Sequence, residues 1–387
     1  MDFWLILFII DWFLFGIVAF AVIYMLIYTI ASQFYTKRDV PKTKQLNRFI
    51  ILIPSYNNPG VIYTVKSVLA QSYPMRLFDV TVISDHNDEM TNFRLAQEPV
   101  THLIPNFTKS TKAKALQLAV NNLPQFKIYD IAIVLDGGSV VDTDFLEKMN
   151  EAFEAAGTKA IQAHRISRNR DSTPARMGAV FEEINNSIFR RGHICIGLSA
   201  AISSSGMVFD FEWFKQQILA AKINWADKEL EALLLRHHIY VDYFDNIMVY
   251  GEKVRQAEEF NRQHRNWIIT KWKAILRNLR YLPKAIIQKH YDMIDKLLQW
   301  MLLSRMVMMG IILFMCIITP FIYFTMALKW WGLFAIVLFV FAMATPNYLV
   351  DDKWDSTFFK IPFVLLSSIL HKFKLGRKIT EAVNLKQ

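Results

Sequence analysis

Polar and acidic side chains stand at the ends of three short apolar runs, and they are the first candidates for chemistry. Residues 49–53, 78–84 and 131–135 are rich in β-branched residues, which is typical of buried strands. The polar residues at their ends are Ser55 to Asn57, Asp85 and Asp136. Ligands bind at the carboxyl ends of strands in open α/β sheets, so these side chains predict one shared crevice. The alternative, that the aspartates only form turns or cap helices, stays open on the sequence alone.

Helical patterns separate the three runs and must position their polar ends. Residues 62–71 and 112–123 carry apolar residues at helical spacing, and each segment lies between two of the predicted strands. This alternation of strands and helices predicts an α/β fold with a parallel sheet covered by helices. Within residues 112–123, Lys112 and the nearby lysines are either a solvated helix face or part of the crevice.

Three nearly uncharged apolar stretches are long enough to cross a bilayer. They are residues 12–31, 306–328 and 332–350. Asp11 is expected at the outer end of the first stretch, and Trp330 and Trp331 at the far end of the second. Five basic residues between positions 37 and 48 follow the first stretch, so the positive-inside rule predicts an outward N-terminus and a cytosolic domain.

Basic residues alternate with apolar ones between positions 271 and 296. One helical face of this region is apolar and carries Ile287, Tyr291, Ile294, Leu298 and Met301. This pattern favours basic amphipathic helices lying on an anionic membrane surface, although an ordinary packed helix pair gives the same pattern. Residues 363–370 are too short to span and precede further basic residues, which predicts a second interfacial helix.

These patterns divide the chain into five parts. They are an N-terminal transmembrane helix with its basic flank (1–35), a cytosolic α/β domain (36–262), interfacial helices (263–300), two transmembrane helices (301–350), and a C-terminal interfacial helix with a basic tail (351–387). The formal net charge is +10, and it gathers beside the apolar spans. Membrane lipids are therefore the expected partner of this charge, and nucleic acid is not.

Several motifs resemble those of the family 2 glycosyltransferases, which have a GT-A fold, and especially of the membrane-anchored bacterial members related to cellulose and hyaluronan synthases. The matching segments are Ile53–Asn57, Ser67–Pro74, Asp136 with Asp144–Leu146, Trp225–Leu230, and Gln263–Trp267. The resemblance covers nearly the whole chain, including the order of spans and interfacial helices. It implies transfer of a sugar, with inversion, from a nucleotide-diphosphate donor to a lipid-linked or polysaccharide acceptor at the bacterial inner membrane.

The resemblance also implies roles for individual residues. Nucleotide contacts would come from Ser55, Tyr56, Asn57, Asp85, Lys112 and Asp136. Asp136 would also be the first carboxylate ligand of a divalent metal, Mg²⁺ or Mn²⁺. Asp227 would be the general base, and Gln263 and Trp267 would contact the acceptor or the diphosphate. Asp227 as a plain helix cap and Trp267 as a membrane anchor remain the alternatives.

Four positions depart from the family pattern. Gly138 stands where the second metal carboxylate is expected, Ala226 replaces an acidic residue before the base, and Ser204 replaces a glycine. Asn266 replaces an arginine that would pair with the diphosphate, and an amide supplies neither its charge nor its bidentate geometry. Two hypotheses therefore remain: an active glycosyltransferase, or a catalytically impaired subunit that acts as a scaffold with a partner subunit or as a homo-oligomer.

Overall fold

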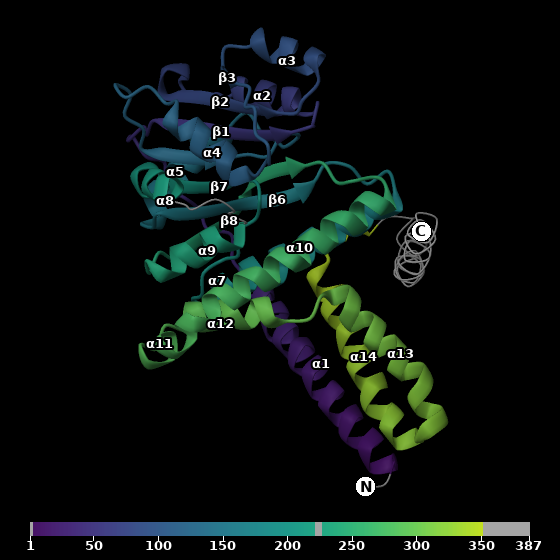
Figure 1. The fold of residues 1–387 in the computed structure, drawn as a ribbon. Coiled ribbons are helices and arrows are strands. Elements are labelled where there is room, and N and C mark those ends of the chain that lie inside the picture. Colours follow the sequence, from purple (N-terminus) through teal and green to yellow (C-terminus); the bar gives the residue numbers. More distant parts are fainter. Residues whose placement is uncertain (1–2, 221–226, 351–387) are drawn as a thin grey trace, which may run out of the picture.

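An eight-stranded sheet lies at the centre of the described chain, residues 3–220 and 227–350, in this computed structural model (Figure 1). The strand order is β3-β2-β1-β4-β7-β6-β8-β5. The strands are β1 Phe49–Tyr56, β2 Phe78–Asp85, β3 Thr101–Leu103, β4 Ile131–Val134, β5 Val140–Val141, β6 Ala160–Ser167, β7 Met207–Asp210 and β8 Val241–Gly251.

The first four strands pair in parallel, as the alternation of strands and helices predicted. The sequence analysis placed no strand beyond β4, and there the sheet becomes mixed because β7 inserts antiparallel between β4 and β6. The first predicted strand, residues 49–53, is too short, since β1 continues through Pro54 to Tyr56. The ladder with β4 ends at Leu52, and beyond it the N–H of Gly137 still donates to the Pro54 carbonyl at 3.3 Å. Pro54 itself has no N–H that needs a partner.

Helices cover both faces of the sheet. Phe49, Ile51 and Ile53 of β1 pack on the side of α2 and α5, whereas Ile50 and Leu52 pack on the side of α4, α8 and α9. This alternation follows from the two-residue period of a strand that is buried on both faces. The helices of this domain are α2 Val61–Leu69, α3 Glu89–Ala96, α4 Lys112–Asn121, α5 Phe145–Ala156, α6 Thr173–Asn186, α7 His193–Ile196, α8 Phe211–Ala220 and α9 Asp227–Arg236.

Three helices are long and apolar enough to cross a membrane, and they project together away from the sheet (Figure 1). They are α1 Phe3–Gln33, α13 Arg305–Ile322 and α14 Phe324–Ala344. Their bounds differ from the predicted spans 12–31, 306–328 and 332–350. The break between the last two helices falls at Tyr323, where the backbone is extended. Pro320 lies one helical turn before this break, and a hydropathy profile alone does not reveal where such a helix ends.

The sequence predicted Asp11 and Trp330 at the ends of apolar stretches, but both lie inside helices, Asp11 in α1 and Trp330 in α14. Asp11 lies within α1 and pairs with Lys329 of α14. The indole N–H of the fully buried Trp330 donates to the other oxygen of Asp11 at 2.8 Å. Together these contacts join α1 to α14 inside the helix bundle. A carboxylate in an apolar helix needs a cation or a hydrogen-bond donor from another segment of the chain, and α14 supplies both here.

The helices α10 Ala257–Asn278, α11 Leu282–Ile287 and α12 Tyr291–Met301 lie between the sheet and the three apolar helices (Figure 1). The predicted apolar face is divided between two of them, because α11 ends at Ile287 and α12 begins at Tyr291. Ile287 is nonetheless 82 % exposed and Tyr291 66 % exposed, so apolar surface remains on the outside of this region. The predicted helix at 363–370 lies outside the described residues.

The helix α1 packs against the domain at a π-helical turn, Ser187–Gly192, which links α6 to α7. A Cβ on Gly192 would lie 2.3 Å from the carbonyl oxygen of Tyr28, so only glycine allows this approach. Beside it, Asp295 of α12 accepts hydrogen bonds from Tyr24 and Tyr28 of α1. The same carboxylate lies 3.0 Å from Nε2 of the buried His193. One carboxylate therefore joins α1, α7 and α12.

Candidate functional site

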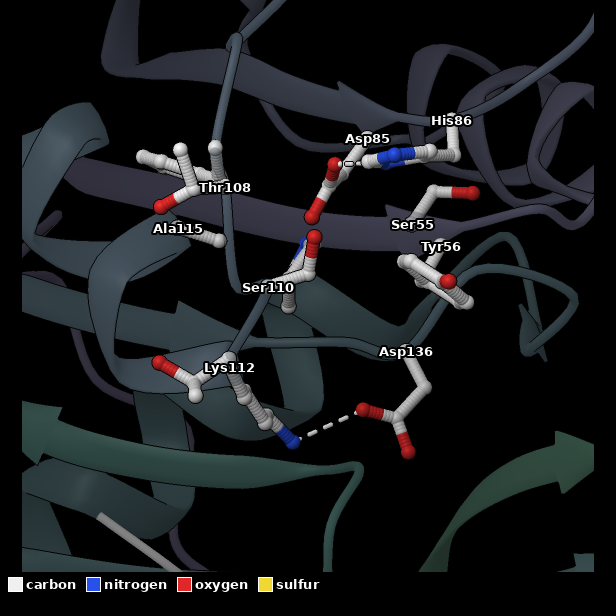
Figure 2. A pocket seen from close by; sticks show the side chains of 12 residues that line it. Ser55, Tyr56, Asp85, His86, Thr108, Ser110, Lys112, Ala115 and Asp136 are labelled. Carbon is white, nitrogen blue, oxygen red and sulfur yellow. Dashed lines mark hydrogen bonds and ion pairs between the residues drawn. The ribbon is translucent and has the colours of Figure 1, made fainter. Parts of the chain in front are cut away.

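A cavity of about 390 Å³ opens at the carboxyl ends of β1, β2 and β4 (Figure 2). Five of the six predicted nucleotide residues line it, namely Ser55, Tyr56, Asp85, Lys112 and Asp136. The topology explains this grouping, because the parallel strands β1, β2 and β4 all end at the same edge of the sheet. The predicted shared crevice is present at this edge.

Asn57 is the predicted nucleotide residue that does not line the cavity. Its side chain is exposed, its φ is 42°, and its backbone N–H donates to the carbonyl of Asp85 at 3.0 Å. Asn57 therefore shapes the turn after β1. The neighbouring Asn58 is more constrained, since its amide donates to the carbonyl of Gly137 at 2.7 Å and joins the β1 turn to the turn after β4.

The end of the cavity at β2 carries Asp85 and two aromatic rings. Oδ1 of Asp85 lies 2.6 Å from Nδ1 of His86, which has a φ of 56° (Figure 2). The rings of His86 and Tyr56 are 5.4 Å apart, and Tyr56 is largely exposed. A buried carboxylate beside exposed ring faces can accept from a sugar hydroxyl or base amine while a planar base stacks.

The loop before α4 supplies four lining residues that the sequence analysis missed, namely Phe107, Thr108, Ser110 and Thr111; His86 after β2 is a further one. The hydroxyl of Thr111 caps α4 by accepting from the backbone N–H of Lys114 at 3.3 Å. The N-terminus of α4 therefore opens beside Lys112, and helix N-termini favour anions. The hydroxyl-rich segment 108–111 just before a predicted helix was the available signal.

Lys112 lies between the two aspartates to which the resemblance assigns catalytic work. Its Nζ donates to Oδ1 of Asp136 at 2.7 Å (Figure 2). It also donates to the carbonyl of Ser204. The same nitrogen is 3.8 Å from Oδ1 of Asp227, the first residue of α9. All three charged side chains remain part-exposed. The predicted base and the predicted metal carboxylate thus meet across one ammonium group.

The electrostatics keep Lys112 and Asp136 charged. Burial raises the pKa of Asp136, but the charges of Lys112 and Arg165 outweigh it, so the net shift is downward. Burial lowers the pKa of Lys112, but Asp136 and Asp227 outweigh it, so the net shift is upward. Arg165 of β6 is a cation that the sequence analysis missed. Its signal was an arginine inside a strand-like run.

The residues around Asp136 do not fit a divalent metal. Hard cations need several oxygen ligands, whereas Oδ1 of Asp136 is occupied by an ammonium and Gly138 offers no side chain. Within residues 3–220 and 227–350, no group of three or more His, Cys, Asp or Glu side chains is placed to hold a metal. Asp142, the nearest later acid, does not line the cavity, and it accepts from the Tyr250 hydroxyl at 3.2 Å.

Gln263 and Trp267 lie on α10, and neither lines the cavity. Both are exposed, as is Asn266. The ammonium of Lys271, one turn further on, lies 5.3 Å from the centre of the Trp267 ring. Farther along, Arg277 of α10 pairs with Glu229 of α9, which fixes α10 against the helix that begins at Asp227. Ala226, the other altered position, lies outside the described residues.

The mixed sheet, with a ligand cavity at its parallel edge, defines a GT-A type of glycosyltransferase fold. The family described as glycosyltransferase like family 2 matches residues 47–270, which is more than half of the chain. The chain therefore belongs to glycosyltransferase family 2. None of the curated proteins matches it.

A comparison with solved structures found matches at low sequence identity. One is the mannosyltransferase PcManGT from Pyrobaculum calidifontis in complex with GDP-Man and Mn²⁺, with a TM-score of 0.52 and 11 % identity over 84 % of this chain and 96 % of that one. Another is S. aureus TarS 1–349, with a TM-score of 0.44 and 11 % identity over 85 % of this chain and 92 % of that one.

Proposed function

We propose that this protein is a membrane-bound, inverting glycosyltransferase that moves a sugar from a nucleotide-diphosphate donor to a lipid-linked or polysaccharide acceptor. The observation that carries the proposal is Lys112 between Asp136 and Asp227 at the edge of the cavity. A cation is needed where a diphosphate leaves, and a carboxylate is needed where an acceptor loses a proton. Family membership and the GDP-mannose bound to PcManGT support the donor class.

The donor would lie with its nucleotide along the cavity and its diphosphate near Lys112. Asp85 would accept from the ribose or base, and Tyr56 with His86 would offer ring faces for stacking. The N-terminus of α4 and its Thr111 cap would face the diphosphate. This arrangement places the sugar toward Asp227.

The transfer would proceed by a single displacement. The acceptor oxygen forms a bond to the anomeric carbon while the bond from that carbon to the β-phosphate oxygen breaks, and that oxygen keeps the electron pair. Asp227 takes the proton of the acceptor hydroxyl. Its part-exposed carboxylate, at the first turn of α9, is open to such an acceptor. Attack from the face opposite the leaving group inverts the anomeric configuration.

The membrane setting is part of the proposal. The helices α1, α13 and α14 would span the bacterial inner membrane with the sheet domain in the cytosol. Exposed apolar residues of α11 and α12 would lie in the interface and bring the site near lipid-linked acceptors. Gln263 and Trp267 on α10 would contact such an acceptor from the membrane side.

A second candidate is a family member that binds the nucleotide but has lost turnover, and acts as a scaffold in a glycan-assembly complex. Gly138 and Asn266 favour it, because both replace groups that would neutralise the diphosphate. The two candidates predict the same fold and the same cavity. They differ in whether sugar is transferred.

The test is a donor screen on the purified full-length protein in mild detergent. Radiolabelled UDP- and GDP-sugars are offered with a lipid extract as acceptor, and transfer of label to lipid or polymer is measured. We expect transfer from one donor, reduced by roughly 10²–10⁴-fold in Asp227→Asn. Asp79→Asn is the matched control, because Asp79 pairs with Lys127 at the opposite edge of the sheet. Nucleotide binding without transfer from any donor would favour the scaffold instead.

A further inference from the structure

In the cavity, the ammonium group of Lys112 contacts Asp136, the residue to which the resemblance assigns a divalent metal. Nζ of Lys112 lies 2.7 Å from Oδ1 of Asp136, and it also donates a hydrogen bond to the Ser204 carbonyl. Ser204 itself departs from the family pattern. The ammonium is thus held on two sides by Asp136 and by the loop before β7.

We propose that Lys112 takes the place of the divalent metal, so that this protein binds the diphosphate of its donor, and stabilises it as a leaving group, without a metal ion. The inference rests on the proposed function, since it concerns the same donor. This proposal also explains the altered residue Gly138. The second metal carboxylate is missing there because the site does not have to hold a metal.

A count of hydrogen-bond donors supports the substitution. A lysine ammonium has three N–H donors, and Asp136 and Ser204 accept two of them. Asp227, at 3.8 Å, is too far to accept the third, although its charge still acts on the ammonium. One N–H therefore remains for an oxygen of the diphosphate. Lys112 also lies at the first position of α4, where the helix adds partial positive charge.

The local charge also balances. A metal site with two carboxylates and a divalent cation has no net charge, and one carboxylate with one ammonium also has none. Replacing an aspartate by Gly138 removes one negative charge, which matches the loss of one positive charge when an ammonium replaces the metal. Arg165 and Asp227 add one positive and one negative charge beside this pair, so the balance holds with them included.

The space for the missing carboxylate is not kept open. Gly138 has a φ of 90°, and its backbone N–H donates to the hydroxyl of Thr64 at 2.8 Å. A Cβ built on Gly138 would lie 3.1 Å from Nδ2 of Asn58, whose amide bonds to the carbonyl of Gly137. The turn after β4 is therefore built around a glycine, and an aspartate at position 138 would be strained and crowded against Asn58.

In the transfer step, Lys112 would keep its proton and act as a hydrogen-bond donor. The bond between the anomeric carbon and the β-phosphate oxygen breaks, and the charge that develops on that oxygen meets the free N–H of Lys112. The acceptor oxygen forms the new bond to carbon, and Asp227 takes its proton. Every charge that changes is then balanced by groups of the chain itself.

The experiment is calorimetric binding of UDP and of GDP to the full-length protein in mild detergent, once in EDTA and once in Mn²⁺. We expect the wild-type Kd to agree within about threefold between the two conditions. Lys112→Met, which keeps the stem and removes the charge, is expected to weaken binding by at least tenfold in EDTA. Lys127→Met is the matched control, since it breaks a part-exposed lysine–aspartate pair of 2.8 Å at the opposite edge of the sheet.

Three results separate the hypotheses. Wild-type binding that requires Mn²⁺ would overturn the metal-free site and leave the proposed function intact. No binding of either nucleotide under any condition would overturn both. Unchanged binding by Lys112→Met in EDTA would overturn the role of Lys112. If Lys112→Met unfolds, as judged by circular dichroism, Lys112→Arg decides the question: it keeps a cation, so it should still bind without metal, and strictly Mn²⁺-dependent binding by this variant would refute the inference.

Discussion

Glu231 should control how firmly the base-bearing helix α9 is held, and its contacts allow the effect to be estimated. Its carboxylate is fully buried and accepts from Nζ of Lys228 at 2.8 Å, from the backbone N–H of Ile202 at 3.1 Å and from the indole of Trp300 at 3.3 Å. Nζ of Lys296 on α12 is also 3.3 Å away. The residue thus joins α9 to α12 through Lys296 and Trp300, while Lys228 of α9 supplies a second cation.

The electrostatic contribution of Glu231 follows from its pKa. Burial raises that pKa, but Lys228 and Lys296 outweigh burial and lower the pKa from 4.5 to about 2. A shift of this size stabilises the folded state by about 3 kcal/mol at neutral pH. Because the folded pKa is the lower one, the contribution is complete above about pH 4.5 and is lost as the pH falls toward 2.

The test is Glu231→Gln, with unfolding by urea in mild detergent followed by tryptophan fluorescence. We expect a loss of about 3 kcal/mol at pH 7, because the variant leaves two lysines without a counter-ion, and a smaller loss at pH 3. Adding Lys296→Met should restore part of the stability. Glu147→Gln, on the exposed face of α5, is the control. A loss below about 1 kcal/mol at pH 7, or an equal loss at both pH values, would refute the reasoning.

Three further predictions concern substitutions at Gly192, Gly138 and Asp295. Gly192→Ala should lower the free energy of unfolding by about 1–3 kcal/mol, because its Cβ would meet the Tyr28 carbonyl; an unchanged melting temperature would contradict this packing. Gly138→Asp should also lower the melting temperature, because its φ is 90°, and should not make UDP or GDP binding depend on Mn²⁺; a gain of such dependence would show that a metal site can be restored. Asp295→Asn should lower the free energy of unfolding by about 1–3 kcal/mol, because an amide replaces the buried carboxylate that accepts from Tyr24 and Tyr28, and a loss below about 0.5 kcal/mol in the same urea assay would contradict this role.

The cavity could be placed from the sequence because strand ends have local signals. Asp85 and Asp136 directly follow β-branched runs, and parallel pairing brings such ends together whatever lies between them. Lys112 was found through the family motif, and its position at the start of α4 agrees with the predicted helix start. The local rules and the tertiary structure agree at these positions.

Other features depend on contacts between distant segments, and a single sequence carries no signal for these. The antiparallel β7 enters the sheet from a segment far along the chain, and no local period distinguishes its direction. The contact of Lys112 with Ser204 joins residues 92 positions apart. Asp11 was predicted at the end of a span because its partner Lys329 lies in α14, far along the chain, and no local pattern reveals the pair. The predictions for Ala226 and for residues 351–387 fall on parts of the chain that are not described.

The pairing of Asp11 with Lys329 also has a consequence for biosynthesis. The two residues are separated by 318 positions, so at roughly 5–20 residues per second the ribosome needs about 15–60 seconds to reach the second after making the first. In the proposed membrane setting, the unpaired acid of α1 costs roughly 2.5–3.5 kcal/mol on insertion scales during that interval. Synthesis of α14 then supplies both the ammonium and the Trp330 indole. In the proposed membrane setting, synthesis of α14 therefore stabilises the insertion of α1, and a chain truncated before α14 should be extracted from the membrane more readily than the full chain.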